Sequence, residues 1–318
     1  MKSITLRHLN PQRDFALLAE WFTTLEGATN TAESLKEYYE KTSWRIREQV
    51  AEDEAGQVLG FYWAVRDEHS PEKAYLNLFV DPNQRKQGIG SQLMPLGIAD
   101  ARSLGANSLQ ALVMDTDPSF KRFAEGFGFV QKRHSIGMRL DLAHWDDSSY
   151  DELIRKLEDE GFDFTSMQAL SNTEDAQRQL YQLNNSATLD TPNATQDDGW
   201  PNFEAFQSSV CQQSWYNPAG QKVVIERASG QFVGMSAIST DESAHTAYNL
   251  FTGVARAFRG RGLATAVKVT ALRFARDEMQ IKEVFTHHND ENDPMIAIDR
   301  KLGYVQSPGT IYMVKELT

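Results

Sequence analysis

The sequence predicts an α/β protein built from two copies of one domain, each a mixed, mostly antiparallel twisted sheet flanked by helices. Two repeated motifs indicate the duplication. GQVLG at residues 56–60 recurs as GQFVG at 230–234, and RKQGIG at 85–90 recurs as RGRGLA at 259–264. One sequence offset relates both pairs, and the elements expected around them follow the same order. Because chance repeats would not share an offset and an order, we expect two tandem domains.

In the first half, residues 1–9 read as a strand. Apolar periodicity predicts two helices over 13–42, interrupted near 27–30, and alternation predicts strands near 44–52, 57–68 and 73–81. After the glycine turn we expect a helix over 90–104, a buried strand over 108–114, a short helix over 118–127 and a closing strand pair over 129–142.

The second half repeats this order. We expect a strand near 163–170, helices over 173–186 and 203–213, strands over 222–228, 231–239 and 245–254, a helix over 263–278, a strand over 283–288, a helix over 294–302 and a last strand pair from 304. The predicted boundaries are an N-terminal domain at 1–145, a linker helix at 146–162 and a C-terminal domain at 163–318.

Composition limits the classes of partner. The net charge of −12 disfavours nonspecific binding to nucleic acid or to anionic membranes and favours a cationic small molecule. No apolar run approaches the roughly 20 residues that a membrane span needs, and the first residues show no secretion signal. The single cysteine, Cys211, cannot form an internal disulfide, and no residues are spaced as metal ligands. We expect a cytoplasmic protein with no metal.

Each half carries a glycine-containing turn between a strand and a helix, at 85–90 and at 259–264. Such a turn points backbone amides at one place, and glycine lets an anion approach the backbone without a Cβ in the way. A diphosphate needs donors of this kind. The sequence therefore predicts two anion-binding turns, with Arg85 and Lys86 adding positive charge to the first.

Two other phosphate-binding motifs fit less well. A Walker motif needs Lys-Ser or Lys-Thr directly after its last glycine, but Gly90 is followed by Ser91 and Gly262 by Leu263. A dinucleotide-binding fold places its glycines after the first strand of a parallel sheet, whereas three antiparallel strands come first here.

At these residues the chain resembles the GNAT superfamily of acetyl-CoA-dependent N-acetyltransferases, in its tandem form. The signature turn, Arg or Gln-x-x-Gly-x-Gly or Ala, fits 85–90 and 259–264, and a late helix ending in Gly-Phe or Gly-Tyr fits 128–129 and 303–304. The resemblance implies that the strand before each turn binds pantetheine and that the turn binds the diphosphate of acetyl-CoA. The residues implied are Leu78, Phe79, Val80, Arg85, Lys86, Gln87, Gly88, Ile89, Gly90 and Ser91, and in the second half Thr252, Gly253, Val254, Arg259, Gly260, Arg261, Gly262, Leu263, Ala264, Thr265 and Asn292.

The resemblance also implies a tyrosine four residues before the late glycine, which protonates the leaving thiolate. Counting back from Gly128 gives Ala124, and from Gly303 gives Asp299, so neither half keeps it. Either another group such as Tyr312 supplies the proton, or one half binds the cofactor without turnover.

The C-terminal half is the expected catalyst. Pro95 falls inside the helix after the first turn, where proline removes a hydrogen bond and can kink the helix. The helix after the second turn has no proline. The alternative, that Pro95 is tolerated and both halves are active, stays open.

Acceptor residues are expected between 187 and 201, a stretch with no counterpart in the first half. The resemblance implies that this region lines the acceptor site, and Asp190, Asp197, Asp198 and Trp200 would suit a cation there. The alternative interpretation is that the acids occupy turns and caps and that Trp200 only anchors the loop.

His287 and His288 end the strand expected to diverge from the cofactor-binding strand. With a reference pKa of about 6.5, an imidazole can take a proton from an ammonium, which makes His288 the candidate base. A histidine at a strand end is also commonly a packing or surface residue.

Together these observations predict an N-acetyltransferase that moves an acetyl group from acetyl-CoA to a primary amine, on a small molecule, in its second half. Two alternatives remain. The missing tyrosines would suit a non-catalytic acyl-CoA-binding sensor, and an acidic acceptor surface would also suit a protein N-acetyltransferase.

Overall fold

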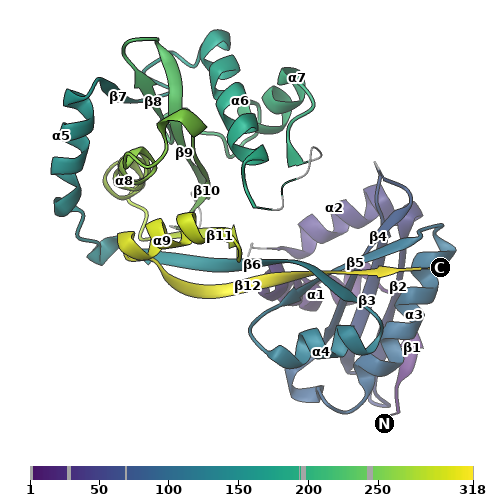
Figure 1. Cartoon of the computed structure of the whole chain (residues 1–318). Helices are drawn as coiled ribbons and strands as arrows, with labels where there is room; N and C mark the ends of the chain where they lie inside the picture. Colours follow the sequence, from purple (N-terminus) through teal and green to yellow (C-terminus); the bar gives the residue numbers. More distant parts are fainter. Residues whose placement is uncertain are drawn as a thin grey trace. The chain divides into compact units, whose positions relative to one another are not determined.

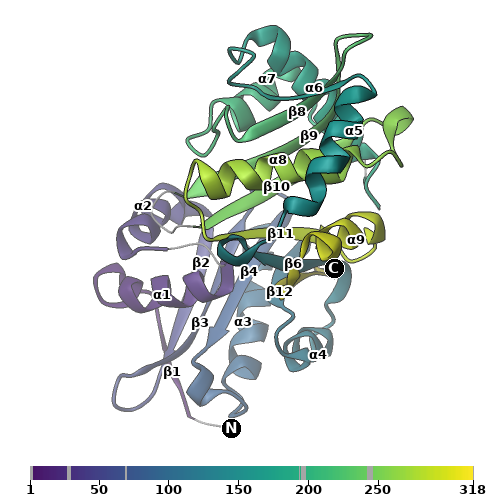
Figure 2. The same cartoon turned by 90° about the vertical axis from the view of Figure 1, so that its left-hand side faces the viewer.

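The computed structural model describes residues 3–26, 30–68, 70–192, 194, 198–241 and 246–317, and the chain divides into two compact units. The first unit comprises Met1–His134 with Thr310–Thr318, and the second comprises Ser135–Gly309. Each unit is a mixed sheet with helices on both faces (Figures 1 and 2), so the predicted fold class is confirmed.

The first unit has the strand order β1-β2-β3-β4-β5-β12, in which only β4 and β5 are parallel. Its elements are β1 Thr5–Arg7, α1 Pro11–Glu26, α2 Ala32–Thr42, β2 Ile46–Glu52, β3 Val58–Arg66, β4 Lys73–Val80, α3 Ile89–Ser103, β5 Ser108–Met114, α4 Pro118–Gly126 and the final part of β12 Val305–Glu316.

Strand β3 shows why helices cover both faces of the first sheet. Tyr62 and Ala64 point into the core under α3, whereas Phe61 and Trp63 point into the core under α1 and α2. Successive side chains of a strand face opposite sides of the sheet, so a continuous apolar run must be covered on both faces. Figure 2 shows α1 and α3 on opposite sides of β3.

The second unit has the strand order β6-β11-β10-β9-β8-β7, in which β10 and β11 are parallel. Its elements are β6 Val130–Asp141, α5 Asp151–Asp159, β7 Phe162–Ser166, α6 Glu174–Leu189, α7 Phe203–Phe206, β8 Gln221–Glu226, β9 Gln231–Asp241, β10 Thr246–Val254, α8 Leu263–Asp277, β11 Glu283–Asn289 and α9 Asp293–Leu302. A π-helical turn, Gln207–Cys211, continues α7.

The second sheet is also covered on both faces. On β9, Phe232 and Met235 enter the core under α6 and α7, and Val233 enters the core under α8. Figure 1 shows α6 and α8 on opposite sides of β9. This arrangement leaves one face of the sheet for the helix that follows the glycine turn and the other for the loop region after α6.

The predicted closing strand pairs at 129–142 and from 304 are wrong, because β6 and β12 are each one continuous strand. Gly137, a residue suited to a turn, instead permits close approach of two backbones. A Cβ there would lie 2.1 Å from the carbonyl oxygen of Pro308. Residues 135–141 of β6 pair with β11, and residues 310–316 of β12 pair with β5. Each sheet therefore takes a strand segment from the other half of the sequence.

The compact units consequently differ from the boundaries at 145 and 163. Residues 135–145 belong to the second unit and residues 310–318 to the first. The predicted linker also packs within the second unit, where Asp147 accepts hydrogen bonds from Arg273 and, at 2.6 Å, from Arg276 of α8.

Three local expectations need adjustment. Helix α3 runs uninterrupted through Pro95, so this proline does not break it. The strand expected at 163–170 ends at Ser166, where a turn begins, and the helix expected at 203–213 changes to π-helical geometry after Phe206. Within the described ranges, the helices are too short or too polar to cross a bilayer.

Candidate active site

The two glycine turns have the same backbone form. The residues that cap α3 and α8, Gly88 and Gly262, have φ angles of 84° and 93°, which an L side chain adopts only with strain. In the second turn the first helical hydrogen bond runs from the Ala266 amide to the Gly262 carbonyl. The amides of residues 263–265 therefore have no acceptor within the helix and lie where an anion would be bound.

The turn arginines hold each turn to the preceding strand. Arg85 Nε donates to the Val80 carbonyl at 3.1 Å, and Arg259 Nε donates to the Val254 carbonyl at 2.9 Å. The outer guanidinium nitrogens differ in their surroundings. Arg85 stacks over the ring of Phe120 at 4.9 Å, whereas Arg259 forms an ion pair with an acid from another part of its unit.

That acid is Asp190, at the C-terminal end of α6. Its carboxylate lies 2.7 Å from Arg259 and also accepts a hydrogen bond from Arg256. The hydrogen bond from Arg256 lowers the pKa of Asp190. The structure thus places Asp190, predicted for the acceptor site, on the arginines of the glycine turn.

The strands expected to bind pantetheine, β4 and β10, each border an opening in their sheet. Strand β4 pairs with β5 only over Lys73–Tyr75, and β10 pairs with β11 only over Thr246–Tyr248. Beyond these pairs the parallel neighbours separate, so the later residues of β4 and β10 have backbone groups facing the gap. The predicted residues occupy these strand ends and turns: Leu78, Phe79 and Val80, then Arg85–Ser91, in the first unit, and Thr252, Gly253 and Val254, then Arg259–Thr265, in the second, with Asn292 at the start of α9.

A cavity of about 270 Å³ lies on the α6 face of the second sheet. Its lining is mainly apolar and aromatic, and its floor includes Leu250 and Phe251 of β10. These residues lie two and three positions after Tyr248, the last β10 residue paired with β11, and they precede the strand end that reaches the glycine turn. The cavity therefore adjoins the opening between the two strands.

Two of the predicted acceptor residues, Asp198 and Trp200, line this cavity. Trp200 is also anchored, because its backbone amide donates to Asn185 at 2.7 Å and its indole donates to Asn184 at 3.0 Å. Asp197 lies outside the described residues. Sequence reasoning missed Phe206 and Trp215 in the lining, because neither stands in the acidic loop that drew attention to its neighbours.

The two candidate catalytic residues lie in different units. Tyr312 is on the part of β12 that pairs with β5, where its hydroxyl donates to Gln110 and its ring lies under Arg133 at 5.7 Å. Burial raises the pKa of Tyr312. Tyr312 thus belongs to the first unit, and it does not join His288 within one unit.

His288 is at the end of β11 in the second unit, and its side chain is 9% exposed. Its Nε2 lies 2.6 Å from Oδ2 of Asp299 on α9, and Asp299 in turn pairs with Lys268 of α8. Sequence reasoning noted Asp299 only as the place of a missing tyrosine, and missed Lys268. The available signal was a lysine within the otherwise apolar buried stripe of α8.

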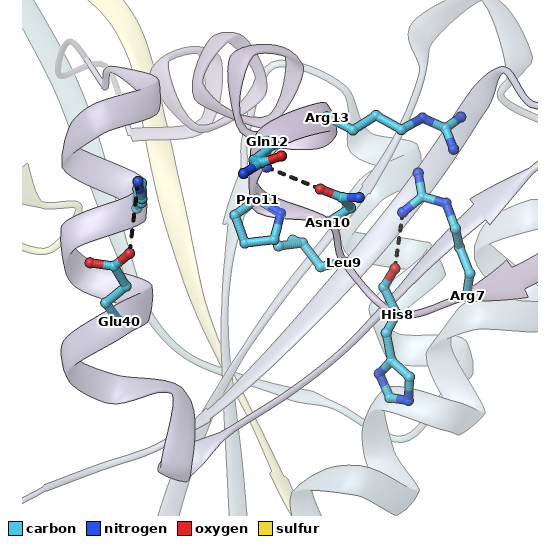
Figure 3. Close-up of a pocket in the computed structure, with 9 residues that line it drawn as sticks. Arg7, His8, Leu9, Asn10, Pro11, Gln12, Arg13 and Glu40 are labelled. Atoms are coloured by element: carbon cyan, nitrogen blue, oxygen red, sulfur yellow. Dashed lines mark hydrogen bonds and ion pairs between the residues drawn. The ribbon is translucent and has the colours of Figure 1, made fainter.

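A larger cavity, about 710 Å³, lies in the first unit beside the start of α1 (Figure 3). Its arginines are already paired. Arg7 lies 2.7 Å from Asp14, and Arg13 lies 2.5 Å from Glu52. None of the residues predicted from the sequence lines this cavity, so we assign it no part in the site.

Comparisons with known proteins agree with this geometry. A profile described as Acetyltransferase (GNAT) family matches residues 15–129, and one described as Acetyltransferase (GNAT) domain matches residues 152–305. The mycothiol acetyltransferase of Propionibacterium freudenreichii subsp. shermanii is 35% identical over 90 residues, which cover 28% of this chain and 29% of that protein. The match thus spans less than a third of that relative.

Solved structures resemble the whole chain. The GCN5-related N-acetyltransferase from Sphaerobacter thermophilus has a TM-score of 0.68 at 18% identity, over 99% of this chain and 96% of that one. The tandem GNAT protein from the clavulanic acid biosynthesis pathway has a TM-score of 0.65 at 18% identity, over 99% of both chains. At this identity the likeness concerns the fold alone. With a GNAT profile on each half and the glycine turn built twice, the chain belongs to the GNAT acetyltransferase family as a tandem member.

Proposed function

We propose that this protein transfers an acetyl group from acetyl-CoA to a primary amine on a small molecule, and that the second unit performs the reaction. The observation that carries the proposal is the arrangement around β10. After its last pair with β11, this strand borders the apolar cavity and then reaches the glycine turn before α8. An acceptor in the cavity and a thioester beside the strand would meet at the opening between β10 and β11.

The residues of the second turn fit the diphosphate of acetyl-CoA. Gly260 and Gly262 hold positive φ angles, and no side chain caps the helix at Gly262. The amides of residues 263–265 would donate to the diphosphate, and the backbone of residues 252–254 would align pantetheine. The thioester supplies the activated acetyl group, and the chain positions both reactants. The first turn has the same form, so we propose that it also binds acetyl-CoA.

The cavity favours a particular class of amine. The aromatic rings in its lining include Trp200, Trp215 and Phe251, and Asp198 supplies a carboxylate. A volume of about 270 Å³ lies just below the range of roughly 300–1,000 Å³ usual for drug-sized ligands. We therefore propose an acceptor with one ammonium on a small apolar or aromatic body. A polyamine would need further carboxylates along its length.

The first unit suits the alternative, a binding role without turnover. At the position where the family has its thiolate-protonating tyrosine, this unit has Ala124, a buried apolar residue. We propose that this unit binds acetyl-CoA without transferring the acetyl group. As for the compartment, a chain with one cysteine cannot form an internal disulfide, which supports the cytoplasm.

The test is a thiol-release assay with 2-phenylethylamine, 1,4-diaminobutane and a lysine-containing peptide. We expect turnover with phenylethylamine and much less with the diamine or the peptide. Turnover and, by calorimetry, acetyl-CoA binding would also be measured for Arg259→Glu and Arg85→Glu. Arg85→Glu is the matched control, because both arginines bond to the preceding strand in the same way.

We expect Arg259→Glu to abolish turnover and Arg85→Glu to retain it. Acetyl-CoA binding without release of thiol for any amine would leave only a sensor. Turnover of the peptide alone would favour a protein N-acetyltransferase.

A further inference from the structure

A buried ionic array crosses the second unit from α8 to β11. Lys268 and Asp299 are both 0% exposed and form a direct ion pair, and the second carboxylate oxygen of Asp299 lies 2.6 Å from His288 Nε2. The Lys268 ammonium also lies over the ring of Tyr304, 4.7 Å from its centroid. Burial lowers the pKa of Lys268, and the charge of Asp299 opposes that shift. Burying two ions is costly, so their presence needs a reason.

The first unit shows that the fold does not require these charges. Met94 lies six residues after Gly88, as Lys268 lies six after Gly262, and Ala124 lies four before Gly128, as Asp299 lies four before Gly303. Val113 is the next-to-last residue of β5, as His288 is of β11. Met94, Ala124 and Val113 all pack in the apolar core under α3. The same positions are therefore filled by an apolar trio in one unit and by an ionic array in the other.

The array ends at His288, on β11 beside the opening where β10 and β11 separate. His288 lies three residues beyond Phe285, the last residue of β11 that pairs with β10. Alternation along β11 puts His288 on the same face as Val284, which packs in the core beneath α8. Thr286, between them, donates its hydroxyl proton to the Asn249 carbonyl of β10 at 2.9 Å. His288 is thus the next side chain on this face after Thr286, the last of them that bonds to β10.

A carboxylate can only accept a hydrogen bond, so Asp299 selects the form of His288 with its proton on Nε2. The other ring nitrogen, Nδ1, then carries the lone pair. Within the described part of the chain, the hydrogen bond of the His288 ring is the one to Asp299. This is the arrangement of a general base with an orienting carboxylate behind it.

We propose that Lys268 and Asp299 are positioning residues that fix the ring and tautomer of His288, and that His288 Nδ1 takes a proton from the acceptor ammonium in the second unit. This inference rests on the proposed function. The ammonium loses two protons as its nitrogen bonds to the acetyl carbon and the carbon–sulfur bond breaks. One proton goes to Nδ1 and then to solvent, and the other ends on the released thiolate. Lys268 holds the Asp299 carboxylate in place through their ion pair, and Asp299 stabilises the imidazolium.

The first test needs no turnover. Selective ¹⁵N labelling of the seven histidines and long-range proton–nitrogen correlation spectra of the full chain report the tautomer of each ring, and His288→Gln assigns the signal. We expect His288 to carry its proton on Nε2, and the Lys268→Met/Asp299→Asn double variant to show a mixture of tautomers. A wild-type ring protonated on Nδ1 would overturn the inference.

The second test places the apolar trio of the first unit into the second, as Lys268→Met/His288→Val/Asp299→Ala. Because the first unit packs these residues at the same positions, we expect the variant to fold, and to bind acetyl-CoA within about twofold of wild type. We expect kcat to fall by about 10²–10⁴-fold, the usual contribution of a general base, with little change in KM for the amine.

For His288→Gln alone, we expect kcat to fall by a similar factor. This single variant keeps the inference testable if the triple variant folds poorly. Retained turnover in His288→Gln would overturn this inference and leave the proposed function intact. Absence of turnover in the wild type, with acetyl-CoA bound, would instead overturn the proposed function and with it the role of His288 as base.

Discussion

Removal of the Asp190 carboxylate, by Asp190→Asn, is expected to tighten acetyl-CoA binding. In the free protein the Asp190 carboxylate lies 2.7 Å from Arg259 and also accepts a hydrogen bond from Arg256. It therefore neutralises two guanidinium groups that could otherwise bind the diphosphate. Arg259 does not need Asp190 to stay in place, because its Nε donates to the Val254 carbonyl at 2.9 Å. Loss of the acid should therefore free the positive charge of Arg259 to bind the diphosphate, while the arginine stays bonded to the strand.

The magnitude follows from the exposure of the pair. Arg259 is 41% exposed and Asp190 is 19% exposed, and an ion pair of this kind is worth about 0.2–1 kcal/mol. If binding of the diphosphate breaks the pair, Asp190→Asn should lower Kd by about 1.4- to 5-fold. The gain should shrink in 1 M salt, where the Debye length is about 3 Å.

Calorimetric titration of the full chain with acetyl-CoA, at low and high salt, is the assay. Asp198→Asn is the matched control, since Asp198 lines the acceptor cavity rather than the turn, and it should leave Kd unchanged. Weaker binding by Asp190→Asn would refute the reasoning, and would mean that the acid orients the arginines for the diphosphate.

Three further results are expected. Gly262→Ala should weaken acetyl-CoA binding, whereas Gly105→Ala, also at positive φ but with open space around it, should lower the free energy of unfolding by about 1–2 kcal/mol with no effect on binding. Burial opposes ionisation of Asp147, but its arginine partners lower its pKa, so Asp147→Asn should reduce stability by about 1–3 kcal/mol at neutral pH. In urea unfolding, that difference should begin to shrink as the pH falls below about 4, the unfolded-state pKa. It should vanish only once the pH falls below the lower pKa of Asp147 in the folded state. Trp200→Ala should raise KM for phenylethylamine at least about tenfold, with the calorimetric Kd for acetyl-CoA unchanged.

The glycine turns could be predicted because their chemistry is local. A left-handed glycine, a helix start and an arginine that reaches back to the strand end all lie within a few residues of one another. The repeat supplied the second copy at the same spacing. The sequence pattern was therefore sufficient to predict the turns and the element order, apart from the closing strands, which are single strands rather than pairs.

The partners of charged side chains could not be predicted in this way. Asp190 and Arg259 are far apart in the sequence, as are Lys268 and Asp299, and only the packing of α6 against β10 and of α8 against α9 brings them together. An acid in a long loop is compatible with an acceptor site, a cap or an ion pair, because its charge alone does not fix its partner.

Because β6 and β12 each pair with a strand from the other half of the sequence, the two sequence halves are not the two folded units. Strand β5 has residues 310–316 as its antiparallel neighbour, and β11 has residues 135–141. A cut at residue 145 would leave β5 without that neighbour and the second sheet without β6, exposing strand edges that are paired in the whole chain. It would also separate Tyr312 from Gln110. The sequence repeat and the folded unit are therefore different divisions of this chain, and a site residue must be assigned to the sheet that holds it rather than to the half that encodes it.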